Sequence, residues 1–129
     1  MVKGVYKEML AKADAAVSSV DVDTAAGLMD DGNYLLVDIR DIRELKRDGM
    51  VPGAFHAPRG MLEFWIDEES PYHKPVFAED RTFVFYCASG WRSLLAAQTA
   101  QQMGLKVKSM RGGFGEWKKS GKPVATRDD

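Results

Sequence analysis

The sequence lacks three features, each of which would have indicated a class of protein. Basic residues are not in excess, since 18 Lys and Arg face 19 Asp and Glu, so the net charge of -1 gives little support for nucleic-acid binding. The longest apolar runs, such as 34–37 and 83–88, are far shorter than the roughly 20 residues that cross a bilayer. Charged residues near the N-terminus interrupt any apolar core of a signal peptide. We therefore expect a cytoplasmic protein that binds neither nucleic acid nor membrane.

Cysteine is nearly absent too. Cys87 is the only cysteine in the sequence, so no disulfide can form within the chain. A lone thiol suits a reducing compartment, where it is either a buried apolar side chain or a reactive group. Metal ligands are equally sparse, because one cysteine and two scattered histidines lack the spacing of a zinc site. We expect no metal and no cofactor.

Strand and helix patterns alternate along the 129 residues, a length typical of one domain. Apolar residues recur at helical spacing over residues 3–17, which predicts an amphipathic helix. We divide the chain into an N-terminal helical extension, residues 1–18, and one domain, residues 19–129. The alternation predicts an α/β fold of three layers, with a mostly parallel central sheet and helices on both faces.

The elements of this fold are bounded by caps, glycines and prolines. Strands are expected at 34–37, 54–57, 82–86 and 107–110. Helices are expected at 24–29 after an Asp23 cap, at 41–48, at 62–66, from 92 to 103, and at 114–119. The strongest strand pattern, 82–86, leads directly into Cys87, and the strongest helix of the domain begins near Arg92.

The loop between that strand and that helix is the best candidate for a functional site. Ligands of open α/β sheets bind beyond the carboxyl ends of the strands. Inward-facing N–H groups and the positive end of the following helix would form an anion cradle. Gly90 allows the positive φ that such a loop needs, and Arg92 supplies a planar cation. In this setting we expect Cys87 to be a reactive thiolate rather than an inert core residue.

The loop C-A-S-G-W-R-S at 87–93 resembles the active-site loop of the rhodanese sulfurtransferase family, in which four residues separate a cysteine and an arginine. Three further motifs agree in order: L-L-V-D-I-R at 35–40 with Glu44 downstream, G-M-V-P-G-A-F-H-A-P at 49–58, and R-G-G-F-G-E-W at 111–117. Together they extend the resemblance over residues 20–123, and identify a single rhodanese-like domain.

The resemblance implies a thiosulfate sulfurtransferase-like enzyme with Cys87 as catalytic residue. Its thiolate would take the outer sulfur of a donor such as thiosulfate, hold it as a persulfide, and pass it to cyanide, a thiol or a sulfur-accepting protein. The loop would supply the binding groups, from Ala88, Ser89, Gly90, Trp91, Arg92 and Ser93. Trp91 stands where the family commonly has a smaller or basic residue, and we expect it to shape the entrance.

Loop length bears on the alternatives. Related Cys-dependent phosphatases have five residues between Cys and Arg, because their ring of amides must hold a tetrahedral phosphate. Four residues intervene here, which favours sulfur. The alternatives are a Cys-dependent phosphatase or arsenate reductase on the same fold, and a non-catalytic sulfur-relay or redox-sensing module.

Three other polar groups have candidate roles. Arg59 follows the strand at 54–57 and could hold the sulfonate of a donor, with an ordinary surface arginine as the alternative. Arg40 and Glu44 are four residues apart, which predicts a structural ion pair beneath the site. We expect His56 to be a packed or hydrogen-bonded strand residue, because a thiolate held by amides needs no base.

Overall fold

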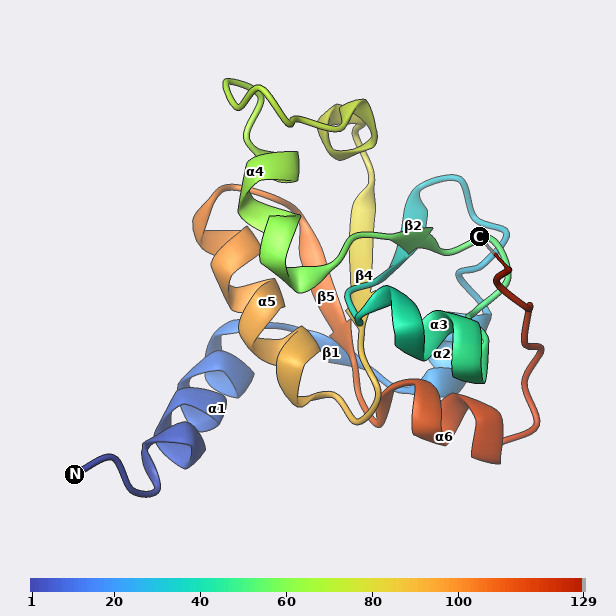
Figure 1. The fold of residues 1–129 in the computed structure, drawn as a ribbon, viewed down its shortest axis with the longest axis horizontal. Helices are drawn as coiled ribbons and strands as arrows, with labels where there is room; N and C mark the ends of the chain where they lie inside the picture. Colours follow the sequence, from blue (N-terminus) through green and yellow to red (C-terminus); the bar gives the residue numbers. More distant parts are fainter. Residues whose placement is uncertain (129) are drawn as a thin grey trace.

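The computed structural model describes residues 1–128 and is built around a five-stranded sheet (Figure 1). The strands are β1 (Ser19–Val20), β2 (Tyr34–Asp38), β3 (Phe55–His56), β4 (Thr82–Tyr86) and β5 (Val107–Met110). Their spatial order is β1-β5-β4-β2-β3, and each strand lies parallel to its neighbours. The predicted parallel α/β sheet is confirmed, with β4 at its centre.

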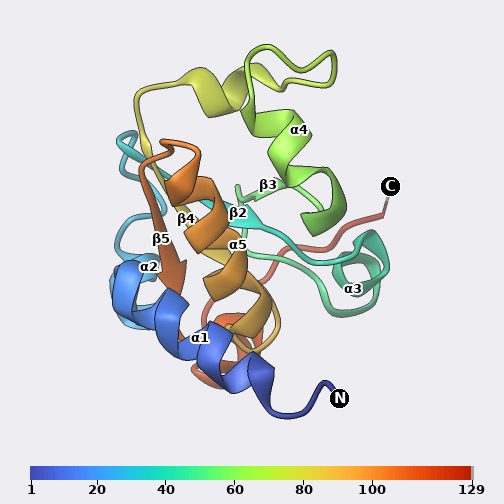
Figure 2. The same cartoon turned by 90° about the vertical axis from the view of Figure 1, so that its left-hand side faces the viewer.

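Helices cover both faces of the sheet, as predicted (Figures 1 and 2). They are α1 (Val5–Ala16), α2 (Val22–Ala26), α3 (Ile42–Asp48), α4 (Leu62–Ile66), α5 (Trp91–Gln102) and α6 (Gly113–Lys119), with two 3-10 turns, η1 (Arg59–Met61) and η2 (Pro75–Ala78). The apolar side chains of α4 and α5 belong to the core on one face, and those of α2 and α6 to the core on the other.

Strand β4 contributes buried side chains to the hydrophobic cores on both faces of the sheet. Phe83 and Phe85 pack with the alanines of α5, whereas Val84 and Tyr86 pack with Trp117 of α6. Successive side chains of a strand point to opposite faces, so a central strand covered on both sides is apolar throughout. This double burial explains why the pattern at 82–86 was the strongest strand signal in the sequence.

The second helix differs from its predicted bounds. It begins at Val22 instead of residue 24, and Asp21, not Asp23, is its N-cap, because the Thr24 N–H donates to Asp21 Oδ1 at 2.7 Å. Both aspartates are suitable caps. Asp21 is the cap because β1, which pairs with β5, ends at Val20, and the helix begins directly after Asp21. That two-residue strand was not predicted, since it is too short to show a period.

Helix α1 packs along α5 (Figure 2). Ala13 is fully buried, and the Gln101 side-chain amide donates to the carbonyl of Ala16 at 2.9 Å. These contacts join the extension to the rest of the fold. The division at residue 18 stays a prediction. Within residues 1–128, no helix combines the length and the apolar character needed to cross a membrane.

Candidate active site

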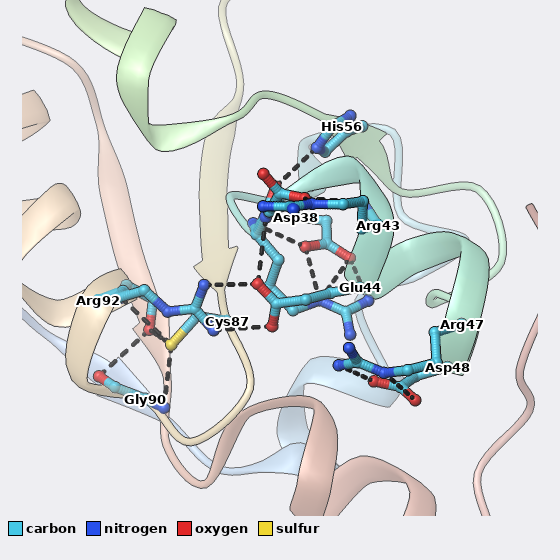
Figure 3. Close-up of polar contacts among 12 residues, drawn as sticks. Asp38, Arg43, Glu44, Arg47, Asp48, His56, Cys87, Gly90 and Arg92 are labelled. Atoms are coloured by element: carbon cyan, nitrogen blue, oxygen red, sulfur yellow. Dashed lines mark hydrogen bonds and ion pairs between the residues drawn. The ribbon is translucent and has the colours of Figure 1, made fainter. Parts of the chain in front are cut away.

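Cys87 lies at the carboxyl end of β4, where the chain turns through residues 88–90 into α5. Its side chain is buried, and its sulfur accepts hydrogen bonds from the backbone N–H groups of Gly90 at 3.1 Å and Ser93 at 3.4 Å (Figure 3). Gly90 has φ 108°, a left-handed conformation that a residue with a Cβ rarely adopts. The positive φ directs the chain back toward the sulfur, so two amides and the first turn of α5 converge on it.

The outer side of this loop is held by the start of α6. The N–H of Phe114 donates to the Cys87 carbonyl at 2.8 Å, and the N–H of Gly115 donates to the Ala88 carbonyl at 2.9 Å. A Cβ at Gly113 would lie 2.6 Å from the Cys87 carbonyl oxygen, so only glycine allows this approach. The sequence analysis assigned no role to Gly113, although the motif R-G-G-F-G-E-W at 111–117 contains it.

A pair of buried serine hydroxyls lies beneath the sulfur. The Cys87 Sγ lies 3.6 Å from Ser93 Oγ, and that hydroxyl donates to the Gly90 carbonyl at 3.2 Å. The Ser93 Oγ also lies 3.1 Å from the Oγ of Ser109, a residue of β5 with 2% of its surface exposed. Sequence reasoning missed Ser109. The signal was a small polar residue two positions after Val107, on the same face of the predicted strand.

Arg92 does not point its guanidinium freely into the loop. Its Nη1 and Nη2 donate to the two carboxylate oxygens of Glu44 on α3, at 2.7 Å and 2.9 Å (Figure 3). The Arg92 hydrogen bonds hold the pKa of Glu44 below its ordinary value, although partial burial opposes this. The same contact raises the pKa of Arg92. Arg92 therefore connects the first turn of α5 to α3.

The predicted ion pair between Arg40 and Glu44 is wrong. Arg40 pairs instead with Asp38, with Nη2 and Oδ2 2.7 Å apart and both side chains almost fully buried. Its Nη2 also donates to the Gly49 carbonyl at 2.7 Å, and its guanidinium lies 4.4 Å from the centre of the Phe114 ring. The spacing rule applies within a helix. Arg40 precedes α3, and its side chain turns inward between β2 and α6.

Arg59 and Arg92 lie along the same groove of about 300 Å³, together with Met9, Leu95, Gln98 and Thr99. Arg59 is partly exposed and its Nη1 donates to Glu63 Oε1 at 2.7 Å. This contact uses one of the five N–H donors of a guanidinium. The structure thus brings two of the predicted binding residues to one groove, although each is also paired with a carboxylate.

Trp91 is the first residue of α5 and does not line the groove of Arg59 and Arg92. Its side chain is 58% exposed, and its ring centre lies 5.5 Å from that of Tyr6 on α1. With Ser89, Gly90 and Ser109 it lines a separate cleft of about 190 Å³. Helix α1 thus supports a residue of the loop, a contact that sequence reasoning did not foresee.

His56 lies at the end of β3, its Nε2 2.8 Å from the Arg40 carbonyl oxygen. The expected hydrogen-bonded strand histidine is confirmed. Across residues 1–128, no cluster of three or more His, Cys, Asp or Glu side chains could hold a metal ion.

Residues 21–120 match the rhodanese-like domain, a range that begins just after β1 and includes β2 to β5, the cysteine loop and α6. The chain belongs to the rhodanese-like family. The family resemblance that the sequence motifs indicated is confirmed. A solved structure with a similar fold, from Rhodopseudomonas palustris, is 50% identical, covers 96% of each chain and has a TM-score of 0.91. It is described as a protein of unknown function and a possible tyrosine phosphatase.

Curated relatives of this rhodanese-like domain are sulfurtransferases. A tRNA sulfurtransferase of Desulfurococcus amylolyticus is 36% identical over 87 residues, which are 67% of this chain but 15% of that protein. The thiosulfate:glutathione sulfurtransferase of Homo sapiens is 29% identical over 110 residues, which are 80% of this chain and 95% of that protein. These relatives support assignment to the rhodanese-type sulfurtransferases.

Proposed function

We propose that this protein is a sulfurtransferase that carries a sulfane sulfur on Cys87, from a donor such as thiosulfate to cyanide or a thiol. One observation carries the proposal. The Cys87 sulfur accepts N–H groups from Gly90 and Ser93 in a loop with four residues between cysteine and arginine. Two such donors favour an anionic sulfur over a neutral one, because hydrogen bonds to a charged acceptor are the stronger ones.

In the first step, the Cys87 thiolate attacks the outer sulfur of thiosulfate. The bond between the two donor sulfurs breaks, and its electron pair leaves with sulfite. Cys87 then carries one additional sulfur as a persulfide anion. In the second step, cyanide or a thiolate attacks that outer sulfur, and the electron pair of the persulfide bond returns to Cys87. The products are thiocyanate or an acceptor persulfide, and atoms and electrons balance without any further reactant.

The loop contributes to these steps by electrostatics and position. The amides of Gly90 and Ser93 stabilise negative charge on Sγ before the attack and after the sulfur leaves. The carbonyls of Cys87 and Ala88 are held by α6, which keeps them away from the reacting sulfur. The loop is fixed by these backbone hydrogen bonds, so its amides need little reorganisation during the reaction.

Donor binding is proposed for the groove that Arg59 and Arg92 share. The sulfonate end of thiosulfate is an anion with three oxygens, and a guanidinium offers several N–H donors in a plane. Because Glu63 and Glu44 partly neutralise the two arginines, we expect the groove to orient a donor more than to bind it tightly.

Phosphate ester hydrolysis is the second candidate, favoured by the relative from Rhodopseudomonas palustris described as a possible tyrosine phosphatase. A phosphoryl group must be surrounded by amides, which needs a wider ring than one sulfur atom. The four-residue loop and the direct amide contacts to Sγ favour sulfur.

The deciding experiment loads the reduced protein with thiosulfate, removes the excess donor and measures the intact mass. We expect one added sulfur, released by cyanide as one equivalent of thiocyanate. Cys87→Ser is the control and should take up none. The same preparation is assayed with an aryl phosphate. Efficient ester hydrolysis without sulfur loading would replace the proposal by the phosphatase, and the absence of both activities would favour a binding or sensing module.

A further inference from the structure

Three polar side chains form a buried chain across three elements at the site. Cys87 follows β4, Ser93 lies in the first turn of α5, and Ser109 lies on β5. The two serines have exposures of 0% and 2%. Their Oγ atoms are 3.1 Å apart, and Ser93 Oγ is 3.6 Å from the sulfur. Burying a hydroxyl is costly unless it is hydrogen-bonded, so this spacing restricts how the protons can be arranged.

With a neutral thiol, each proton has an acceptor. The Cys87 thiol donates to Ser93 Oγ, and the Ser93 hydroxyl donates to the Gly90 carbonyl. A hydroxyl has a single proton to donate. When the sulfur becomes an anion it has no proton, and the best use of the Ser93 hydroxyl is to donate to the sulfur. The Gly90 carbonyl is not left unpaired, because it still accepts from the Leu94 N–H at 3.2 Å.

After this reversal, Ser93 Oγ needs a new donor, and the Ser109 hydroxyl is within hydrogen-bonding distance. We propose that Ser109 is a positioning residue for Cys87, whose hydroxyl donates to Ser93 and so favours donation from Ser93 to the anionic sulfur. Two hydroxyls in series polarise each other, which strengthens the bond to the charged end. The role of Ser109 in catalysis rests on the proposed function, in which the Cys87 sulfur is an anion at the start and at the end of each sulfur transfer.

The test measures how the rate of Cys87 alkylation by iodoacetamide depends on pH, because only the thiolate reacts. Removing the second hydroxyl in Ser109→Ala should move the midpoint of this profile upward by about half a pH unit. Ser93→Ala loses the direct donor and should move it upward by about one unit or more. When Ser93→Ala and Ser109→Ala are combined, the midpoint should be that of Ser93→Ala alone, because Ser109 acts on the sulfur only through Ser93.

Other charged groups near the loop stay the same in every variant. Arg92 on α5, Glu44 on α3 and Asp38 on β2 interact electrostatically around the site, and they influence the absolute midpoint but not the difference between variants. Ser19→Ala is the matched control. Ser19 of β1 is the register partner of Ser109 in β5. Replacing Ser19 therefore removes a hydroxyl from the neighbouring strand and leaves Ser93 and Ser109 in place. It should leave the midpoint unchanged.

A second pair of variants separates the hydroxyl from strand packing. Ser109→Thr and Ser109→Val have side chains of the same shape, and only Thr keeps the hydroxyl. We expect Thr to have a lower midpoint than Val by about half a pH unit, as in the Ser and Ala pair. The inference would be overturned if Ser109→Thr and Ser109→Val had the same midpoint. It would also be overturned if Ser109→Ala shifted the midpoint equally in the wild type and in Ser93→Ala. Because alkylation needs no sulfur donor, failed sulfur loading refutes the proposed function and leaves this result standing.

Discussion

Arg92 and Glu44 form a two-point ion pair between the active-site loop and α3, although they are 48 residues apart in sequence. The geometry aligns both guanidinium Nη atoms with both carboxylate oxygens, at 2.7 Å and 2.9 Å. A planar pair of this kind specifies orientation as well as proximity. Arg92 therefore holds the start of α5 against α3, while the backbone N–H groups of Gly90 and Ser93 donate to the sulfur.

Glu44→Gln should therefore reduce sulfur transfer more than stability. Glutamine keeps an oxygen for the Asp41 N–H at the start of α3, but it loses the charge that orients Arg92. We expect kcat/KM for thiosulfate to fall about tenfold through misplacement of the loop. The free energy of unfolding should fall by less than about 1 kcal/mol, since the pair is partly exposed.

Asp48→Asn is the matched control for that variant. Asp48 also lies on α3 and pairs with an arginine, but this pair is on an exposed side of the helix. Steady-state kinetics and urea unfolding of both variants give the comparison. If Asp48→Asn lowered kcat/KM as much as Glu44→Gln, the effect would be one of net charge, and the positioning role of the ion pair would be rejected.

The pH dependence of stability should reveal the same pair. Arg92 lowers the folded-state pKa of Glu44 below its ordinary value of 4.5. A group with a lowered folded pKa contributes stability above its unfolded value, and the contribution disappears as pH falls through the folded value. The melting temperature of the wild type should exceed that of Glu44→Gln near neutral pH, and the difference should shrink below about pH 4. A difference that grew in acid would contradict the assignment.

Replacing the cysteine tests the chemistry without altering the shape. In Cys87→Ser, the hydroxyl can still accept from the amides of Gly90 and Ser93, so the loop should keep its conformation. No persulfide can form on oxygen, and thiocyanate production should fall to background. Circular dichroism melts verify that the fold is intact. Substantial activity in this variant would remove Cys87 from the mechanism.

Gly113→Ala tests the packing of α6 against the loop. Both Gly113 and Gly121 have left-handed φ values, of +60° and +76°, so alanine strains each backbone by about 1 to 3 kcal/mol. At Gly121 the new Cβ meets nothing within 4 Å, whereas at Gly113 it meets the Cys87 and Ala88 backbone at 2.6 to 2.7 Å.

We expect Gly113→Ala to displace the loop and abolish sulfur loading, as seen by intact mass. Gly121→Ala should keep full loading, with a moderately lower melting temperature. Equal loading by the two variants would show that the carbonyl contacts from α6 are not needed to shape the loop.

The site could be located from the sequence because its determinants are local. An apolar strand, a cysteine, a glycine and a helix follow one another from residue 82 to residue 102, and each of these signals depends on neighbours in the chain. Burial of β4 on both faces produces its continuous apolar pattern. The cap of α2 shows the limit of local signals, because Asp21 and Asp23 are equivalent caps until β1 pairs with β5.

Tertiary structure decided which partners the polar groups of the site have. Glu44 satisfies a spacing rule with Arg40, yet it pairs with Arg92, because Arg40 precedes α3 and turns into the core. Gly113 and Ser109 acquire their roles only where α6 and β5 meet the loop. The physical reason is that hydrogen bonds and close contacts act over a few ångströms in space. Parallel strands bring together residues that are far apart in sequence, so the sequence by itself determined the fold class and the cysteine loop, and only packing selected the partners.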